Sequence, residues 1–111
     1  MDKLCVFAGT TEGRELVEFL CAQPVKTTAC VATEYGQTLL EPAENLTIHT
    51  GRLNREEMAA LFAREQFSLV VDATHPYASV VTQNICGCCA PGHRHRRTVS
   101  LCRILPGRWT T

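Results

Sequence analysis

Three short motifs in this sequence carry side chains that could bind or act on a small molecule. Residues 8–14 read AGTTEGR, in which the glycines permit close backbone approach to a phosphate and the threonine hydroxyls add donors. Residues 32–36 read ATEYG, and residues 72–78 read DATHPYA. In the last motif, His75 can exchange a proton near neutral pH and Tyr77 can stack or donate a hydrogen bond. Together they indicate nucleotide binding joined to acid–base chemistry.

Each of the three motifs directly follows a predicted strand. Short apolar runs predict strands at 3–8, 27–33, 46–49 and 67–71. Helical spacing of apolar residues predicts helices between them, the first capped by Thr10 or Thr11 and stopped by Pro24. Asn54 with Glu57 forms a capping-box pattern for the second helix. Pro76 suits the first turn of a third helix that runs to residue 85.

This alternation predicts an α/β fold with a doubly wound, Rossmann-like parallel sheet. The carboxyl ends of parallel strands lie at one edge, so the turns after the first and fourth strands should converge there. Some residues remain open to two interpretations. Gly36 suits a positive φ in a loop, Glu34 at the end of the second strand would favour NAD over NADPH, and Asp72 fits either a site or a structural cap.

Composition excludes several classes of protein. The chain has 111 residues with 45% hydrophobic content, which fits one small globular domain. No apolar run reaches the roughly 20 residues of a membrane helix, and the amino terminus lacks a signal-peptide pattern. We therefore expect a cytoplasmic protein with no membrane partner. Residues 1–85 carry a net charge of −5, whereas residues 86–111 carry +5, all of it from arginine.

The segment 86–111 is expected to differ from the rest, with a domain boundary near residue 85. The favoured interpretation is an out-of-frame or disordered basic tail. Its weakly apolar residues 99–105 have no evident pairing partner. The fourth strand is therefore expected to have an open edge. A basic arm for nucleic acid is disfavoured because the arginines are sparse, and we expect no nucleic-acid partner. A zinc site is a further alternative, disfavoured because its ligands are crowded; the candidates are Cys86, Cys88, Cys89, His93 and His95.

The order and spacing of the motifs are similar to the N-terminal domain of the precorrin-6A reductase (cobalt-precorrin-6A reductase) family. The matching strings are GTTEGR, ATEYG, GRL after the third strand and DATHPYA after the fourth, across residues 3–85. The resemblance implies two doubly wound domains with NADPH and a tetrapyrrole substrate in the cleft between them. It implies reduction of one double bond of precorrin-6A, or of its cobalt complex, in cobalamin biosynthesis.

The resemblance also assigns residues. The implied cofactor-binding residues are Gly9, Thr10, Thr11, Gly13 and Arg14 at the pyrophosphate, Thr33 and Tyr35 at the adenosine side, and Gly51, Arg52 and Thr74 along the cleft. His75 and Tyr77 are the implied catalytic residues, with water as the other possible proton source. No metal is implied.

One departure from the family pattern affects the expected activity. The family's second domain is expected to be absent from this chain, so that the Rossmann-like unit is incomplete and shows little turnover alone. A non-catalytic NAD(P)-binding module, or an inactive fragment, is the alternative function, and a zinc-binding adaptor is a more distant one. The sequence leaves open whether the substrate carries cobalt and whether the chain forms oligomers.

Overall fold

A single twisted sheet organises the fold. The structure is a computed structural model that describes residues 2–74, 79–89, 100–105 and 108–109. Within these residues the strands lie in the order β3-β2-β1-β4-β5-β6. Neighbouring strands are parallel, except that β6 runs antiparallel to β5. Their bounds are β1 Asp2–Ala8, β2 Val25–Val31, β3 Leu46–Thr50, β4 Leu69–Ala73, β5 Ser100–Leu105 and β6 Arg108–Trp109.

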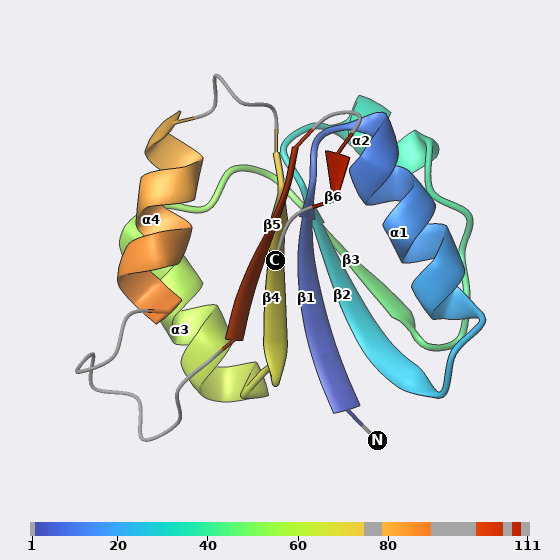
Figure 1. Ribbon diagram of the computed structural model, residues 1–111, viewed down its shortest axis with the longest axis horizontal. Coiled ribbons are helices and arrows are strands. Elements are labelled where there is room, and N and C mark those ends of the chain that lie inside the picture. The colour runs from blue at the N-terminus through green and yellow to red at the C-terminus, as the bar shows by residue number, and fades with distance from the viewer. Residues whose placement is uncertain (1, 75–78, 90–99, 106–107, 110–111) are drawn as a thin grey trace.

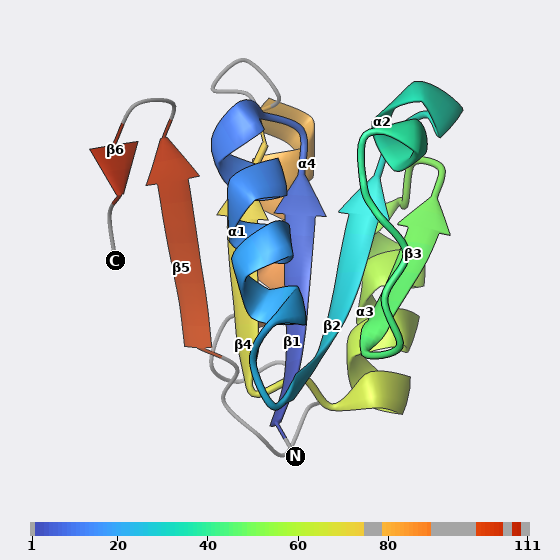
Figure 2. The same ribbon diagram turned by 90° about the vertical axis from the view of Figure 1, so that its right-hand side faces the viewer.

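The described helices cover both faces of the sheet. Helices α1 and α2 lie on one face, and α3 and α4 lie on the other (Figures 1 and 2). The bounds of these helices are α1 Thr11–Cys21, α2 Glu34–Thr38, α3 Arg55–Glu65 and α4 Ser79–Cys89. The strand order reverses between β1 and β4, which is the switch point at which doubly wound sheets bind ligands. The predicted α/β, doubly wound, Rossmann-like sheet is confirmed.

Two apolar cores lie on the two faces of the sheet because strand side chains alternate in direction. In β1, Cys5 and Phe7 pack toward α3 and α4, whereas Val6 packs toward α1. The rings of Phe7 and Phe67 both meet the Phe62 ring edge-on, with centroids 6.2 and 6.0 Å away. Aliphatic residues fill the core beside α1, including Val17 and Val71. The central strand β1 is thus packed against helices on both faces of the sheet.

Three sequence-based expectations about the elements were wrong. The segment after β2 is not a plain loop, because Glu34–Thr38 forms α2 and Gly36 has no positive φ. Helix α4 continues past residue 85 to Cys89. Residues 100–105 do have a partner, since β5 pairs in parallel with β4 and covers the edge that was expected to be open. Pro76, predicted in the first turn of a helix, lies outside the described residues.

The capping box that begins α3 is confirmed and gives a direct stability test. The Asn54 side chain accepts from the Glu57 amide at 2.8 Å, and the Glu57 carboxylate accepts from the Asn54 amide at 3.0 Å. Asn54→Ala is expected to lower the free energy of unfolding by about 1 kcal/mol in chemical denaturation. Glu57→Gln is the control, since glutamine can complete the box; an equal loss in both variants would contradict this account.

No helix among the described residues is long and apolar enough to cross a membrane.

Candidate functional site

The turn between β1 and α1 is fastened to the end of β4. The Gly9 amide donates to the Ala73 carbonyl at 3.2 Å, and the Thr10 hydroxyl donates to the same carbonyl at 2.9 Å. The Thr10 oxygen also accepts from the Gly13 amide at 3.2 Å, which makes Thr10 the N-cap of α1. The turn after β1 and the carboxyl end of β4 therefore meet at one rim, as expected for parallel strands.

Gly13 lets α1 approach the sheet closely. The residue is buried, and a Cβ atom built there would lie 2.9 Å from the Ala73 Cβ and 3.2 Å from the Ala8 Cα. The second contact is with backbone, which cannot rotate away. Gly13 lines neither of the two cavities described below. The structure thus gives this predicted cofactor-binding residue a packing position that sets where the start of α1 lies.

The first cavity, which we call the α1 cavity, lies where α1 begins. Its volume is about 580 Å³. The first amides of an α-helix have no intrahelical acceptor and give this end a partial positive charge. Arg14 adds a full positive charge from the next turn of the helix. The residues that line it are Ala8, Gly9, Thr10, Thr11, Glu12, Arg14, Val31, Ala32, Thr33, Tyr35, Gly36, Leu39 and Leu40.

The wall opposite α1 comes from α2. Thr33 is the N-cap of α2, and its hydroxyl accepts from the Gly36 amide at 3.1 Å. Tyr35 is 74% exposed, so its ring stands at the open side of the cavity and is free to stack on a planar group. Glu34, between them, lines neither cavity. The acidic side chain that would favour NAD is therefore not part of either wall.

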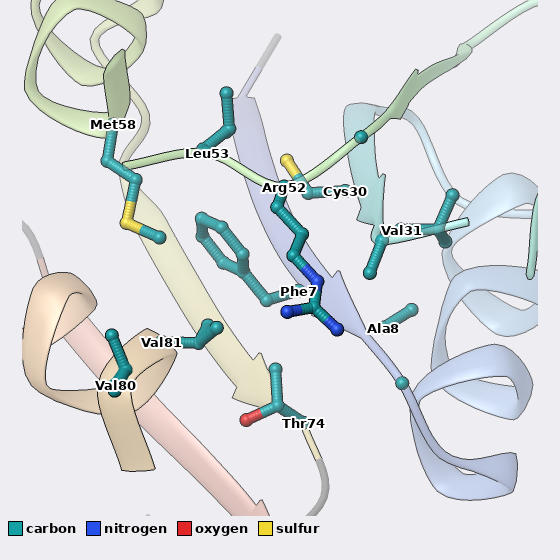
Figure 3. A pocket seen from close by; sticks show the side chains of 13 residues that line it. Phe7, Ala8, Cys30, Val31, Arg52, Leu53, Met58, Thr74, Val80 and Val81 are labelled. Carbon is teal, nitrogen blue, oxygen red and sulfur yellow. The ribbon is translucent and has the colours of Figure 1, made fainter. Parts of the chain in front are cut away.

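The second cavity, the α4 cavity, lies on the other face of the strand ends and is more apolar. Its volume is about 450 Å³. Figure 3 shows the Arg52 side chain reaching across it between Phe7 and Ala8 toward Thr74, while Val80 and Val81 of α4 form the opposite wall. The remaining lining residues are Gly9, Cys30, Val31, Ala32, Gly51, Leu53 and Met58.

The two cavities share the ends of β1 and β2. Ala8 and Gly9 line both, as do Val31 and Ala32, so an elongated ligand can pass over the strand ends from one cavity to the other. Gly51 shapes the α4 cavity through its backbone. Its φ is 118°, which favours glycine, and its amide donates to the Val31 carbonyl at 2.8 Å. This turn carries Arg52 over the α4 cavity.

The structure thus gathers nine of the predicted cofactor-binding residues at two joined cavities. The α1 cavity holds Thr11, Arg14, Thr33 and Tyr35 together with the shared Gly9 and the cap Thr10, and the α4 cavity holds Gly51, Arg52 and Thr74. Gly13 is the exception. The predicted catalytic residues His75 and Tyr77 lie outside the described residues.

Sequence reasoning missed several contributors. Met58, Val80 and Val81 line the α4 cavity but are not among the predicted site residues. The signal that could have found them is their position near the start of helices that follow strand ends at the binding edge. Thr82 was missed entirely; its hydroxyl donates to the Asp72 carboxylate at 2.7 Å.

No cluster of three or more metal-binding side chains occurs among the described residues. His93 and His95 lie outside them. Cys88 faces inward from α4, is 1% exposed, and donates to the Arg55 carbonyl at 3.4 Å. Burial raises the pKa of the Cys88 thiol, although nearby Arg55 acts in the opposite direction. A buried thiol of raised pKa is a core residue and a poor metal ligand.

Comparison with known proteins agrees with this arrangement. Residues 3–103 match the family described as precorrin-6x reductase CbiJ/CobK. The chain belongs to this family. The match extends beyond the region in which the sequence motifs were recognised and includes most of β5.

Curated members of the CbiJ/CobK family include relatives from an archaeon and from bacteria. The cobalt-precorrin-6A reductase of Methanothermobacter thermautotrophicus is 34% identical over 85 residues, covering 76% of this chain and 28% of that protein. The Salmonella typhimurium protein of the same name is 34% identical over 84 residues, covering 76% and 32%. The Rhodobacter capsulatus precorrin-6A reductase is 29% identical over 110 residues, covering 99% and 41%. The chain therefore spans about a third of the length of these relatives.

A solved structure described as CobK precorrin-6A reductase superposes on this CbiJ/CobK chain with a TM-score of 0.74 and 30% sequence identity. The superposition covers 94% of this chain and 39% of the solved one. The fold described above is thus that of part of that protein.

Proposed function

We propose that this chain binds NADPH along its two joined cavities and serves as the nucleotide-binding part of a precorrin-6A reductase. The observation that carries the proposal is the continuity of the α1 and α4 cavities over the ends of β1 and β2, at the switch point of the sheet. A dinucleotide is long enough to need both. Membership of the CbiJ/CobK family supports the same reading.

The donor set of the α1 cavity fits a pyrophosphate. The Gly13 and Arg14 amides are bonded to Thr10, so the Thr11 amide at the helix start offers a hydrogen bond. The Thr11 hydroxyl adds another, and Arg14 supplies positive charge. The Thr10 hydroxyl donates to the Ala73 carbonyl and accepts from the Gly13 amide, so it stabilises the turn between β1 and α1. The adenosine end would lie beside Thr33 and Tyr35, and the position of Glu34 outside both walls supports NADPH over NADH.

The α4 cavity fits the nicotinamide end and one edge of the substrate. Its apolar residues, such as Phe7 and Val81, exclude water around a reacting pair of rings. The Arg52 guanidinium is exposed above the cavity and suits the carboxylate groups of a tetrapyrrole. When bound there, NADPH supplies a hydride to a double bond of the macrocycle. His75 and Tyr77 follow Thr74 in the chain and remain the proposed proton donors.

The proposed reaction is the reduction of precorrin-6A or cobalt-precorrin-6A in cobalamin biosynthesis. The test is a titration of the purified chain with NADPH and NADH, followed by NADPH oxidation with each of the two tetrapyrroles. We expect tighter binding of NADPH than of NADH, tetrapyrrole-dependent changes in NADPH affinity, and only slow oxidation, because this chain spans about a third of the length of its relatives. NADPH binding that no tetrapyrrole affects would favour a non-catalytic nucleotide-binding module, and absence of binding to either nucleotide would contradict the proposal.

A further inference from the structure

A buried carboxylate lies behind the wall of the α4 cavity. Asp72, in β4, is 2% exposed. Among the residues whose side chains the structure describes, the ion pairs are Lys3–Glu65 and Arg64–Glu65, and neither includes Asp72. Burial of a carboxylate is costly unless hydrogen bonds or charges satisfy its oxygens.

Among the described residues, three donors bond to the Asp72 carboxylate. Its Oδ1 accepts from the Thr74 amide at 3.1 Å and from the Thr74 hydroxyl at 2.6 Å. Its Oδ2 accepts from the Thr82 hydroxyl of α4 at 2.7 Å. The two threonine hydroxyl oxygens are 3.5 Å apart. The carboxylate therefore ties the residue that leaves β4 to the helix that forms the opposite wall.

This network fixes what Thr74 can offer to a ligand. Thr74 lines the α4 cavity, and a hydroxyl has a single proton to donate. Because that proton is held by Asp72, the Thr74 oxygen can only accept from the cavity side. The negative charge of Asp72 behind it adds a field that attracts N–H groups and repels anions.

We propose that Asp72 is a positioning and specificity-determining residue, which holds Thr74 as a fixed acceptor so that this wall selects a neutral carboxamide over a carboxylate. The inference rests on the proposed function, since the carboxamide is that of the nicotinamide ring. Thr74 contacts the ligand, whereas Asp72 and Thr82 act through Thr74. The carboxamide N–H group meets an acceptor, but a carboxylate at the same place meets an acceptor and a buried negative charge.

The test compares the binding of NADP⁺ with that of its analogue carrying nicotinic acid in place of nicotinamide. We expect the intact chain to bind the acid analogue about tenfold more weakly. Asp72→Asn removes the charge and nearly preserves the shape, so it should reduce this ratio to about twofold. Asp2→Asn is the matched control, since it is the same substitution at an exposed site at the opposite end of the sheet, and it should leave the ratio unchanged.

A second pair of variants keeps the test valid if Asp72→Asn does not fold. Thr82→Val removes one donor at constant shape, whereas Thr82→Ser retains the hydroxyl. The Thr82 hydroxyl orients the carboxylate that holds Thr74. We therefore expect Thr82→Val to lower the ratio by about threefold, and Thr82→Ser to leave it as in the intact chain. Equal binding of both nucleotides to the intact chain would overturn this inference and leave the proposed function standing. Failure of both nucleotides to bind would overturn the two together.

Discussion

Replacing Gly13 with valine is expected to lower the free energy of unfolding by about 3 kcal/mol, the largest stability effect we foresee for a single substitution on α1. Even a single Cβ atom at this position would lie 2.9 Å from the Ala73 Cβ and 3.2 Å from the Ala8 Cα. Valine adds two further carbons, so α1 must move away from the sheet. The shift should also weaken nucleotide binding, because the start of α1 forms the α1 cavity.

The matched control for Gly13→Val is Glu15→Val, which places the same β-branched residue at an exposed position of the same helix. Its cost should be limited to helix propensity, under about 1 kcal/mol. Chemical denaturation of both variants gives the comparison. If Gly13→Val cost no more than Glu15→Val, the close approach of α1 to Ala8 and Ala73 would not be a determinant of stability.

Arg14→Glu is expected to weaken NADPH binding about 100-fold, which corresponds to about 2.7 kcal/mol. Arg14 lines the α1 cavity and supplies a positive charge beside the helix start. The substitution removes the proposed charge-assisted contact to the pyrophosphate and adds repulsion in its place. Titration at low and at high salt measures the effect, and the difference between variant and intact chain should shrink at high salt because screening weakens it.

Arg64→Glu provides the control for Arg14→Glu. It makes the same charge change near the end of α3, and Arg64 lines neither cavity. Its exposed ion pair with Glu65 contributes little to stability, so the variant should fold and bind nucleotide as the intact chain does. Equal weakening by both substitutions would indicate that net charge alone, rather than a local contact of Arg14, governs affinity.

Much of this fold follows from local sequence pattern. The apolar runs near residues 3–8 and 46–49 are confirmed as β1 and β3 with small shifts of their ends. The capping signals of Thr10 and Asn54 are confirmed because each depends on contacts three residues away. Helix α2 could not be predicted in the same way. It has five residues and none of them is buried, so it produces no apolar periodicity.

The pairing of β5 illustrates a different limit. Residues 100–105 pair with β4, which lies about thirty residues earlier in the chain. Strand pairing at that distance produces no pattern in the local sequence. The same limit applies to the site. Convergence of the turns after β1 and β4 could be predicted, since parallel strands end at one edge. The bond from Thr82 to Asp72 could not, because it depends on the rotation of α4 about its axis.

The interpretation of residues 86–111 as an out-of-frame segment stays a prediction, as does the cytoplasmic location. Translation of the encoding DNA in the other two frames downstream of codon 85 tests the former. The roles of His75 and Tyr77 also stay predictions, because these residues lie outside the described part of the chain.

The central place of β1 has a consequence for the order of folding. In the pairing of β1 with β4, Leu4 lies opposite Leu69, which is 65 residues later in the chain. The first strand can therefore pair with β4 only after those residues have been synthesised. Contacts this distant form slowly because a long loop must first close. Strands β1 to β3 can assemble beforehand, but the carbonyl of Ala73 that anchors the Gly9 turn arrives only with β4. Under the proposed function, a newly synthesised chain would therefore acquire affinity for nucleotide only after β4 has joined the sheet.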